Sequence, residues 1–182
     1  LVPTRREVSM RKDYRRLLLT FFLIITISVC NMYAQEKVNI AVLDFTSEGG
    51  LNESEASTLT NRFRSMLVKT RVYNVLERGR MEEILGEIGF QMSGCTSTEC
   101  AVEVGKILNV QQMISGTIGK LGKTYTVDIS IVDVGTAKII KTLYEDYKGE
   151  IDGLLALMGP IANRLSGLEV KEELTITKDE GT

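Results

Sequence analysis

Two cysteines, Cys95 and Cys100, are the residues of this 182-residue chain whose type and spacing most directly indicate chemistry. They flank the segment Thr96–Glu99, in which the Thr-x-x-Glu spacing is typical of a capping box at the start of a helix. A disulfide between the two cysteines would attach this loop to the helix and stabilise the fold by roughly 2 kcal/mol. We therefore predict a structural disulfide, with two free thiols or half of a metal site as the alternatives.

The chain has three cysteines and no histidine, which restricts the chemistry that it can perform. A zinc site would lack ligands beyond Cys95 and Cys100, and their spacing differs from the Cys-X-X-Cys of redox proteins. The absence of histidine also removes the usual general base at neutral pH and both Ser-His-Asp and Cys-His catalysis. We therefore expect no metal, no cofactor and no catalytic residues, and the predicted protein is not an enzyme.

An alternative function is that of a hydrolase or a small-ligand binder. It would use acidic residues such as Asp44, Glu77 or Asp128. Asp44 lies at the end of an apolar run, and ligands of α/β proteins often bind where strands end. A solvated carboxylate or a helix-cap partner is the simpler interpretation of such a residue. Glu77 and Arg78 are interpreted as a local ion pair, or as hydrogen bonds that orient the following helix.

The amino-terminal segment has the pattern of an export signal. A basic stretch, Met10–Arg16, precedes thirteen residues without a charge, Leu17–Val29. A transmembrane anchor would need roughly 20 apolar residues, so the run is short for that alternative. We interpret residues 1–9 as an upstream extension and residues 10–34 as a signal peptide, which predicts export to the periplasm.

Two processing sites are compatible with this signal. We predict cleavage between Ala34 and Gln35, where a polar mature chain begins. The alternative is lipoprotein processing at Ile27–Cys30, with acylation of Cys30. The first site releases a periplasmic protein, and the second tethers it to a membrane, so membrane contact is expected only through the leader or a lipid on Cys30.

The charge of the chain argues against nucleic acid as a partner. The formal net charge is −2, from 22 basic and 24 acidic residues. The amino-terminal 34 residues contain six of the basic residues but only two of the acidic ones, so the mature chain is more acidic still. Neutralisation of phosphates dominates nucleic-acid affinity, and this sequence has no evident basic stripe for that purpose.

An almost unbroken apolar run, Val38–Phe45, predicts a strand that is buried on both faces. A helical pattern follows, with Asn52 as its N-cap and with Arg64 placed away from the apolar stripe. Pro160 is expected to kink or divide the last helix. The predicted strands are 38–45, 72–76, 112–118, 124–131 and 138–147, and the predicted helices are 52–69, 80–90, 97–108 and 151–168.

This order, β-α-β-α-α-β-β-β-α, predicts an α/β (α+β) protein with helices packed on a mixed five-stranded sheet. The early βα units give parallel strands, and the later hairpins give antiparallel ones. Residues 35–168 form the predicted domain, and residues 169–182 form a polar tail.

Four groups of residues, in this order, resemble the CsgG-like family of envelope proteins, which includes the curli secretion channel. They are Val42–Phe45, Val75–Arg78, Gly94–Cys95 with Cys100–Lys106, and Ser115–Lys120. The resemblance covers about residues 38–168. It implies an α/β sandwich of anticodon-binding-domain type with sheet order 2-1-3-4-5, similar to LpoB and to the amino-terminal domain of TolB.

The resemblance implies an exported, non-enzymatic interaction or assembly domain in the periplasm or at the outer membrane. Its partners would be envelope proteins, including further copies of the chain. The curli channels insert long hairpins into this domain, whereas the connections 46–51, 119–123 and 133–136 are too short for membrane strands of about 9–11 residues. A subunit of an oligomeric secretion channel is therefore the alternative function.

Overall fold

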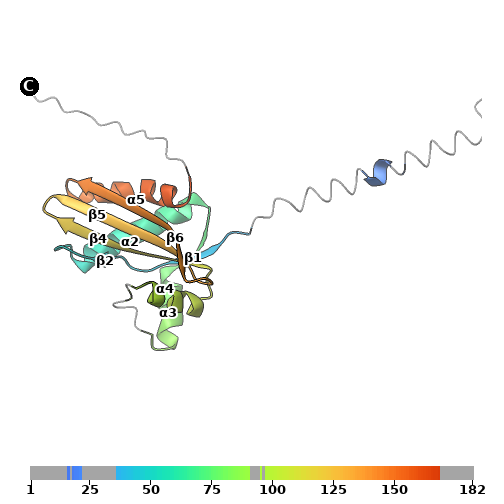
Figure 1. Cartoon of the computed structure of the whole chain (residues 1–182), viewed down its shortest axis with the longest axis horizontal. Helices are drawn as coiled ribbons and strands as arrows, with labels where there is room; N and C mark the ends of the chain where they lie inside the picture. The colour runs from blue at the N-terminus through green and yellow to red at the C-terminus, as the bar shows by residue number, and fades with distance from the viewer. Residues whose placement is uncertain (1–15, 17, 22–35, 91–94, 96, 169–182) are drawn as a thin grey trace, which may run out of the picture. The chain divides into compact units, whose positions relative to one another are not determined.

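The structure, a computed structural model, describes most of the chain after the predicted signal peptide (Figure 1). The described residues are 16, 18–21, 36–90, 95 and 97–168. The chain divides into two units, Leu1–Glu36 and Lys37–Thr182. In the first unit, residues 16 and 18–21 are helical. None of the described helices has the length and apolarity needed to cross a membrane.

The second unit has the predicted order of elements, with one short strand added. Its strands are β1 (Asn39–Val42), β2 (Thr46–Ser47), β3 (Asn74–Val75), β4 (Gln112–Leu121), β5 (Thr124–Asp133) and β6 (Lys138–Lys148). Its helices are α2 (Glu53–Thr70), α3 (Arg78–Glu87), α4 (Thr98–Ile107) and α5 (Ile151–Leu165). The predicted α/β class is confirmed.

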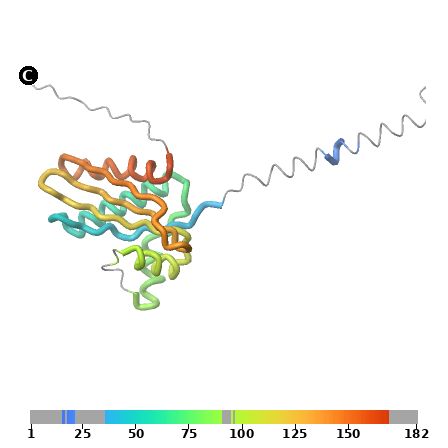
Figure 2. Tube along the Cα trace, in the orientation of Figure 1, coloured from blue at the N-terminus to red at the C-terminus, as the bar shows by residue number. Residues whose placement is uncertain are grey.

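The strands form a mixed sheet in the order β3-β1-β4-β5-β6, which is the predicted order 2-1-3-4-5. β1 pairs in parallel with both β3 and β4, because a helix or helix pair returns the chain to the same end of the sheet each time. β4, β5 and β6 pair antiparallel through short turns, and Figure 2 shows how the chain then folds back from β6 into α5.

Alternate residues of β1, together with Leu43 directly after it, enter two different hydrophobic cores. Ile40 and Val42 pack with residues of α2 and α5, whereas Ala41 and Leu43 pack with residues of α3 and α4. Because successive strand side chains point to opposite faces, one helix pair covers each face of the sheet at β1. The prediction that this strand is buried on both faces is confirmed by the exposed fractions of Ile40, Ala41 and Val42, which are all 0%.

The first strand is interrupted, contrary to the continuous strand 38–45 that the apolar run predicts. Both β1 and β2 pair with β4, with Val42 opposite Ile114 and Thr46 opposite Thr117. The first strand thus advances four residues while β4 advances three. This extra residue has the effect of a β-bulge. The N–H of Leu43 still donates to the carbonyl of Ile114 at 2.8 Å, whereas Asp44 and Phe45 lie outside the regular pairing.

Two helix predictions also need correction. α3 begins at Arg78 rather than Arg80, and it ends before Gly89, whose φ of +69° is a conformation that favours glycine and stops helices. Pro160 does not divide α5, which is a single helix from Ile151 to Leu165. The proline deprives the carbonyl of Ala156 of its helical donor, but Ala156 is exposed, so water can replace that donor.

One face of the long antiparallel strands is largely free of helices in the part of the chain that the structure describes. Of the buried residues in β4, β5 and β6, only Met113 belongs to the core under α3 and α4. Beyond it, this outer face carries mostly polar residues, and α2 and α5 lie on the opposite side (Figure 1). The outer face comprises Ser115, Thr117, Thr126, Asp128, Ser130, Thr142 and Tyr144.

Candidate functional site

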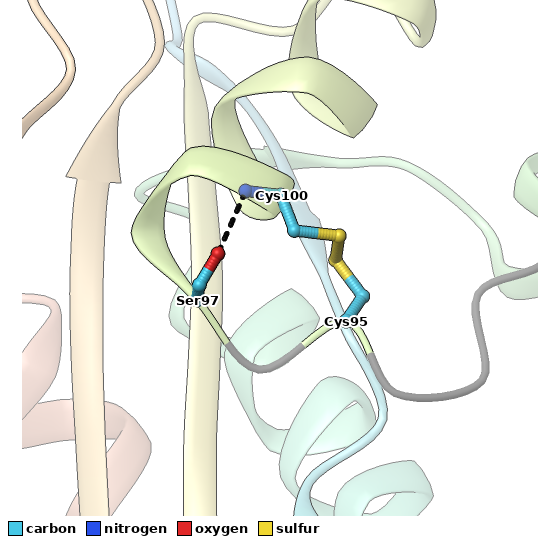
Figure 3. The surroundings of a disulfide bond; sticks show 3 residues. All are labelled: Cys95, Ser97 and Cys100. Atoms are coloured by element: carbon cyan, nitrogen blue, oxygen red, sulfur yellow. Dashed lines mark hydrogen bonds between the residues drawn. A yellow bond between two sulfur atoms is a disulfide. The ribbon is translucent and has the colours of Figure 1, made fainter.

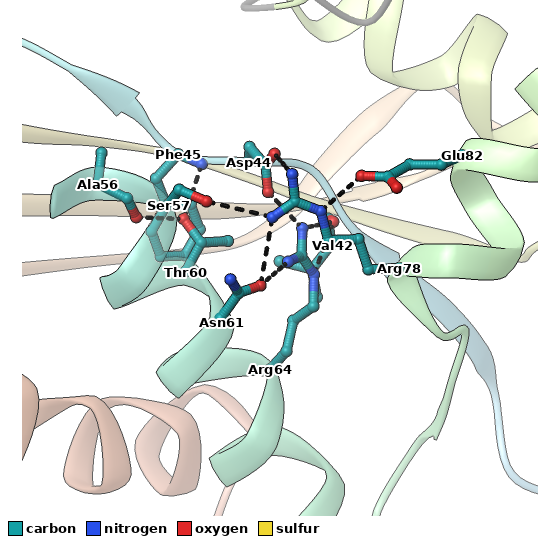
Figure 4. A network of polar contacts seen from close by, with 10 residues as sticks. All are labelled: Val42, Asp44, Phe45, Ala56, Ser57, Thr60, Asn61, Arg64, Arg78 and Glu82. Atoms are coloured by element: carbon teal, nitrogen blue, oxygen red, sulfur yellow. Dashed lines mark hydrogen bonds and ion pairs between the residues drawn. The ribbon is translucent and has the colours of Figure 1, made fainter. Parts of the chain in front are cut away.

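Asp44, the acidic residue at the end of the first predicted strand, lies between two arginines (Figure 4). Its Oδ1 accepts a hydrogen bond from Nη2 of Arg64 at 2.7 Å, and its Oδ2 is 3.0 Å from Nη2 of Arg78. Arg78 also pairs with Glu82, one helical turn later, at 2.7 Å. The network therefore joins the interrupted strand to α2 and α3.

The same network and its neighbour Thr60 provide partners for two backbone groups next to the strand interruption. The Nε and Nη2 groups of Arg64 donate to the carbonyl oxygen of Val42 at 3.3 and 2.8 Å. The hydroxyl of Thr60 accepts a hydrogen bond from the N–H of Phe45 at 3.0 Å and donates to the carbonyl of Ala56. Because buried backbone groups without partners are costly, these two α2 side chains stabilise the interruption.

The burial of Arg64 contradicts its predicted place away from the apolar stripe of the helix. Its exposed fraction is 7%, because it borders the buried residues Thr60 and Phe63 and its long side chain reaches the strand. Sequence reasoning missed the Arg64–Asp44 pair, since nothing local links residues 20 positions apart. The one available signal was an arginine four positions after Thr60, at the edge of the apolar stripe.

The charges in this network balance each other, which removes the basis for an anion site. Asp44 and Glu82 contribute two negative charges, and Arg64 and Arg78 contribute two positive ones. The hydrogen bond to Glu82, followed by the charges of Asp44 and Glu82, raises the pKa of Arg78 above its usual value. Each carboxylate of the network is bonded to an arginine, so we interpret the network as a structural clamp.

The other two acidic candidates do not converge with Asp44 on one site. Glu77 is the N-cap residue of α3 and makes no side-chain capping hydrogen bond. Asp128 lies exposed in the middle of β5, opposite Thr117 on one side and Tyr144 on the other. The predicted local pairing of Glu77 with Arg78 is not observed, since Arg78 pairs with Asp44 and Glu82 instead.

Cys95 and Cys100 form a disulfide at the start of α4 (Figure 3), with their Cα atoms 5.5 Å apart. The helix is capped at Ser97, whose hydroxyl accepts a hydrogen bond from the N–H of Cys100 at 3.2 Å. The predicted capping residue, Thr96, lies outside the described residues. The pKa of Glu99 is lowered by a hydrogen bond from its own backbone N–H and then by one from Ser97.

The predicted processing residues Cys30, Ala34 and Gln35 lie outside the described residues. Within the described ranges, no group of three or more cysteine, aspartate or glutamate side chains could hold a metal ion. A pocket of about 460 Å³ lies between β3 and the turn before β4, and its polar lining includes Glu77 and Arg80. There the amide of Asn74 donates to Oδ1 of Asn39 at 2.6 Å, so these lining groups bond to each other.

The outer side of the sheet and its edge strand, β6, form an exposed surface of the second unit. Exposed large apolar side chains on β6 are Ile139, Ile140 and Tyr144. Next to this edge, the outer face presents the hydroxyls of Thr126, Ser130 and Thr142 and the carboxylate of Asp128. Such a surface suits contact with another protein better than it suits a small molecule, which needs a concave site.

The chain matches the model of one protein family, described as the curli production assembly/transport component CsgG, over residues 26–125. This match covers more than half of the chain. Comparison with curated proteins gives no significant match.

Several solved structures share the fold at low sequence identity. The C-terminal domain of LpoB from Escherichia coli has a TM-score of 0.53 at 13% identity, with 66% of this chain and 93% of that chain covered. Lipoprotein GNA1162 from Neisseria meningitidis has a TM-score of 0.52 at 17% identity, covering 70% and 99%. The PelC dodecamer from Paraburkholderia phytofirmans has a TM-score of 0.50 at 11% identity, covering 74% and 90%.

Proposed function

We propose that this chain, which belongs to the CsgG family, is an exported, non-enzymatic domain of the cell envelope that works by binding other proteins. Its place would be the periplasm or the outer membrane, where envelope proteins assemble. The family description, curli production assembly/transport, supports an assembly role. The PelC dodecamer has a similar fold, and it supports the proposal that the partners include further copies of the chain.

One observation carries this proposal. The acidic residues that could act in catalysis do not form a common site, whereas one side of the sheet is exposed. Asp44 is neutralised by Arg64 and Arg78 in a clamp that stabilises the fold. Glu77 and Asp128 lie on different elements and do not form a site with it. The exposed strand β6 and the outer face, in contrast, present a broad surface, which suits contacts with another protein.

Export is the first step that the proposal requires. The apolar segment 17–29 would carry the chain across the inner membrane, and the disulfide at Cys95 and Cys100 would form in the oxidising periplasm. Cleavage after Ala34 or acylation of Cys30 would then decide between a free and a tethered protein.

Cell fractionation with the variant Leu19→Arg tests this step. The wild-type chain should be found in the envelope or periplasmic fraction, with a shortened amino terminus by intact mass. Leu19→Arg places a charge in the apolar segment and should leave the chain in the cytosol with its thiols reduced. Val68→Arg, an equal change on the exposed side of α2, is the control and should be exported normally. Wild-type protein that stays cytosolic and uncleaved would refute the proposal.

Crosslinking in living cells tests the binding role. Reversible crosslinking followed by purification of the exported chain should recover the same partner, or further copies of the chain, in repeated experiments. Recovery of the monomer alone would contradict the proposal. Ring-shaped particles in detergent extracts would instead favour the second candidate function, a subunit of a secretion channel, which the PelC dodecamer makes worth testing.

A further inference from the structure

Five strands of the sheet have a terminus at the end of the second unit where β1 begins. Ile40, the second residue of β1, lies opposite Val75 of β3 and opposite Gln112, the first residue of β4. Gln112 lies opposite Asp133, the last residue of β5, and Asp133 lies opposite Lys138, the first residue of β6. We call this end of the second unit the basal end.

The helices α2 and α5 also end at the basal end (Figure 2). Arg71, which caps α2, is three residues before Asn74, whose N–H donates to the carbonyl of Val38 directly before β1. The ammonium group of Lys141, near the start of β6, donates to the carbonyl of Leu165 at the end of α5 at 2.7 Å. Side chains at the ends of both helices therefore share one surface with the starts of β1 and β6.

Four basic side chains are exposed on this surface, namely Lys37, Lys69, Arg71 and Lys138. None of the four forms an ion pair within the part of the chain that the structure describes. Lys69 and Arg71 lie at the end of α2, where a basic residue also interacts favourably with the helix dipole. Lys37 and Lys138 lie at the starts of strands, so the helix dipole does not explain their positions.

Fewer acidic groups lie on this surface. Asp133 accepts hydrogen bonds from the N–H and the hydroxyl of Thr136, both at 2.7 Å, and Glu36 adjoins the first lysine in the sequence. Glu99 and Glu103 belong to α4, which covers the opposite side of the sheet from α2 and α5. The basal end therefore carries a surplus of positive charge on the side of α2 and α5, although the net charge of the whole chain is negative.

The same surface exposes large apolar side chains. The exposed fractions of Val68, in the last turn of α2, and of Ile140, near the start of β6, are 55% and 52%. The exposed fraction of Leu168, three residues after α5, is 41%. A surface that combines basic and aliphatic side chains is typical of contact with a membrane, because the basic groups bind lipid phosphates while the apolar groups enter the headgroup region.

We infer that the basal end of the second unit binds the surface of an anionic membrane. The four basic side chains contact lipid phosphates, and the three apolar side chains enter the headgroup region. This contact is additional to the leader and to a lipid on Cys30, and it goes beyond the proposed binding of other proteins. Cys30 is seven residues upstream of Lys37, so a lipid at that position would bring the same end of the unit to the membrane.

Flotation with lipid vesicles tests this inference. The exported chain is given a specific protease site after Gln35, and cleavage of the folded protein removes the leader and any lipid on Cys30. The cleaved protein should float with phosphatidylcholine vesicles that contain phosphatidylglycerol, but not with vesicles of phosphatidylcholine alone. High salt should release it, because salt screens the contacts between lysine and phosphate.

Charge reversal tests whether the basal end makes the contact. Lys69→Glu combined with Lys138→Glu should weaken vesicle binding at least about tenfold, because each basic side chain near an anionic membrane contributes about 1 kcal/mol. Lys123→Glu combined with Lys148→Glu is the matched control, with the same change of net charge at the opposite end of the sheet. The control should weaken binding by less than about threefold.

A second pair of variants tests the apolar part of the contact. Ile140→Ser should weaken vesicle binding about threefold or more, because an apolar side chain no longer leaves water. Leu121→Ser is the matched control at the opposite end of the sheet, where Leu121 is exposed by 83%, and it should leave binding unchanged. Circular dichroism and thermal unfolding verify that every variant is folded.

Cleaved wild-type protein that does not float with anionic vesicles would overturn the inference. So would equal effects of the two lysine pairs, or binding to polyglutamate in solution as tight as to vesicles, which would indicate an acidic protein as the partner. The acidic segment 169–182 follows Leu168 at this end, so vesicle binding that appears only after its removal would also refute the inference. The proposed function fails separately, when crosslinking in cells recovers the monomer alone.

Discussion

At the scale of single residues, the arginine at position 64 shows how a charged side chain can become part of the core. Arg64 reaches from α2 to the interrupted first strand, where it binds the carbonyl of Val42 and the carboxylate of Asp44. Its guanidinium donates twice to this carbonyl, which faces the side of β1 on which β3 has already ended. The pair is therefore a structural feature of the fold, and the same geometry explains why Asp44 is not free for chemistry.

Arg64→Met tests this role, because methionine fills similar space but donates no hydrogen bond. We expect the free energy of unfolding in urea to fall by about 1–3 kcal/mol, since the carbonyl of Val42 loses both side-chain donors. Arg62→Met is the matched control on the exposed side of the same helix, and it should change stability by less than about 0.5 kcal/mol. Equal effects of the two substitutions would contradict the clamp.

Residue-level prediction from sequence was limited by distance along the chain. The interruption at Asp44 depends on the pairing of both β1 and β2 with β4, about 70 residues later. No local pattern reports such a register difference, so the apolar run looked like one strand. The ion pairs of Asp44 with Arg64 and Arg78 could not be predicted either, because they join residues far apart in the sequence. The disulfide between Cys95 and Cys100 could be predicted from the sequence, because it closes a short local loop.

At the scale of elements, glycines set how closely β6 and α5 approach each other. A Cβ atom on Gly153, in the first turn of α5, would lie 1.8 Å from the hydroxyl oxygen of Tyr147. Tyr147 also stacks on Tyr125, with ring centroids 6.4 Å apart, so it cannot move away freely. The missing side chain at Gly153 thus allows α5 to lie against β6.

Gly153→Ala should lower the free energy of unfolding by about 1–3 kcal/mol, because the added methyl group overlaps Tyr147. Gly86→Ala is the control, since no atom lies within 4 Å of its added Cβ, and it should raise stability by about 0.5–1 kcal/mol. Adding Tyr147→Leu to Gly153→Ala should recover part of the loss in a double-mutant cycle measured by urea unfolding. A higher free energy of unfolding for the single variant Gly153→Ala would contradict the close approach of Gly153 to Tyr147.

The disulfide acts on one element, the start of α4. Replacing Cys95 and Cys100 together by serine should lower the free energy of unfolding by about 2 kcal/mol, which is the chain-entropy value for so short a loop. A reducing agent should produce the same decrease in the wild-type protein. The double variant is its control, and it should not respond to the reducing agent. Wild-type stability that is insensitive to reduction would contradict a stabilising bridge.

Prediction succeeded best where an element has a clear period and close neighbours. The alternation in β5, from Tyr125 to Ile131, gave a half-exposed strand, and the structure buries the predicted apolar side. The α2 helix follows from its apolar spacing and its N-cap, Asn52, whose side chain forms the predicted capping box with Glu55. Boundaries were less accurate, because the ends of α3 and α5 depend on exposure and backbone angles rather than on periodicity.

At the scale of the whole molecule, the chain combines a buried, clamped sheet with an open edge and a polar outer face. The chain belongs to the CsgG family, and it shares its fold with LpoB and PelC. Of the acidic residues that could suggest catalysis, Asp44 stabilises the fold through its two arginines, and Glu77 and Asp128 do not form a site with it. The outer face and strand β6 remain exposed, and we propose that the chain works there by binding other proteins after export.

The most direct measurement is the mass of the species that contain this chain in the envelope fraction after crosslinking in intact cells. The account predicts that most of the chain is found there, in species heavier than the monomer that contain a reproducible partner or further copies of the chain. If most of the chain were instead monomeric, or remained in the cytosol with its amino terminus intact, the central claim would be wrong.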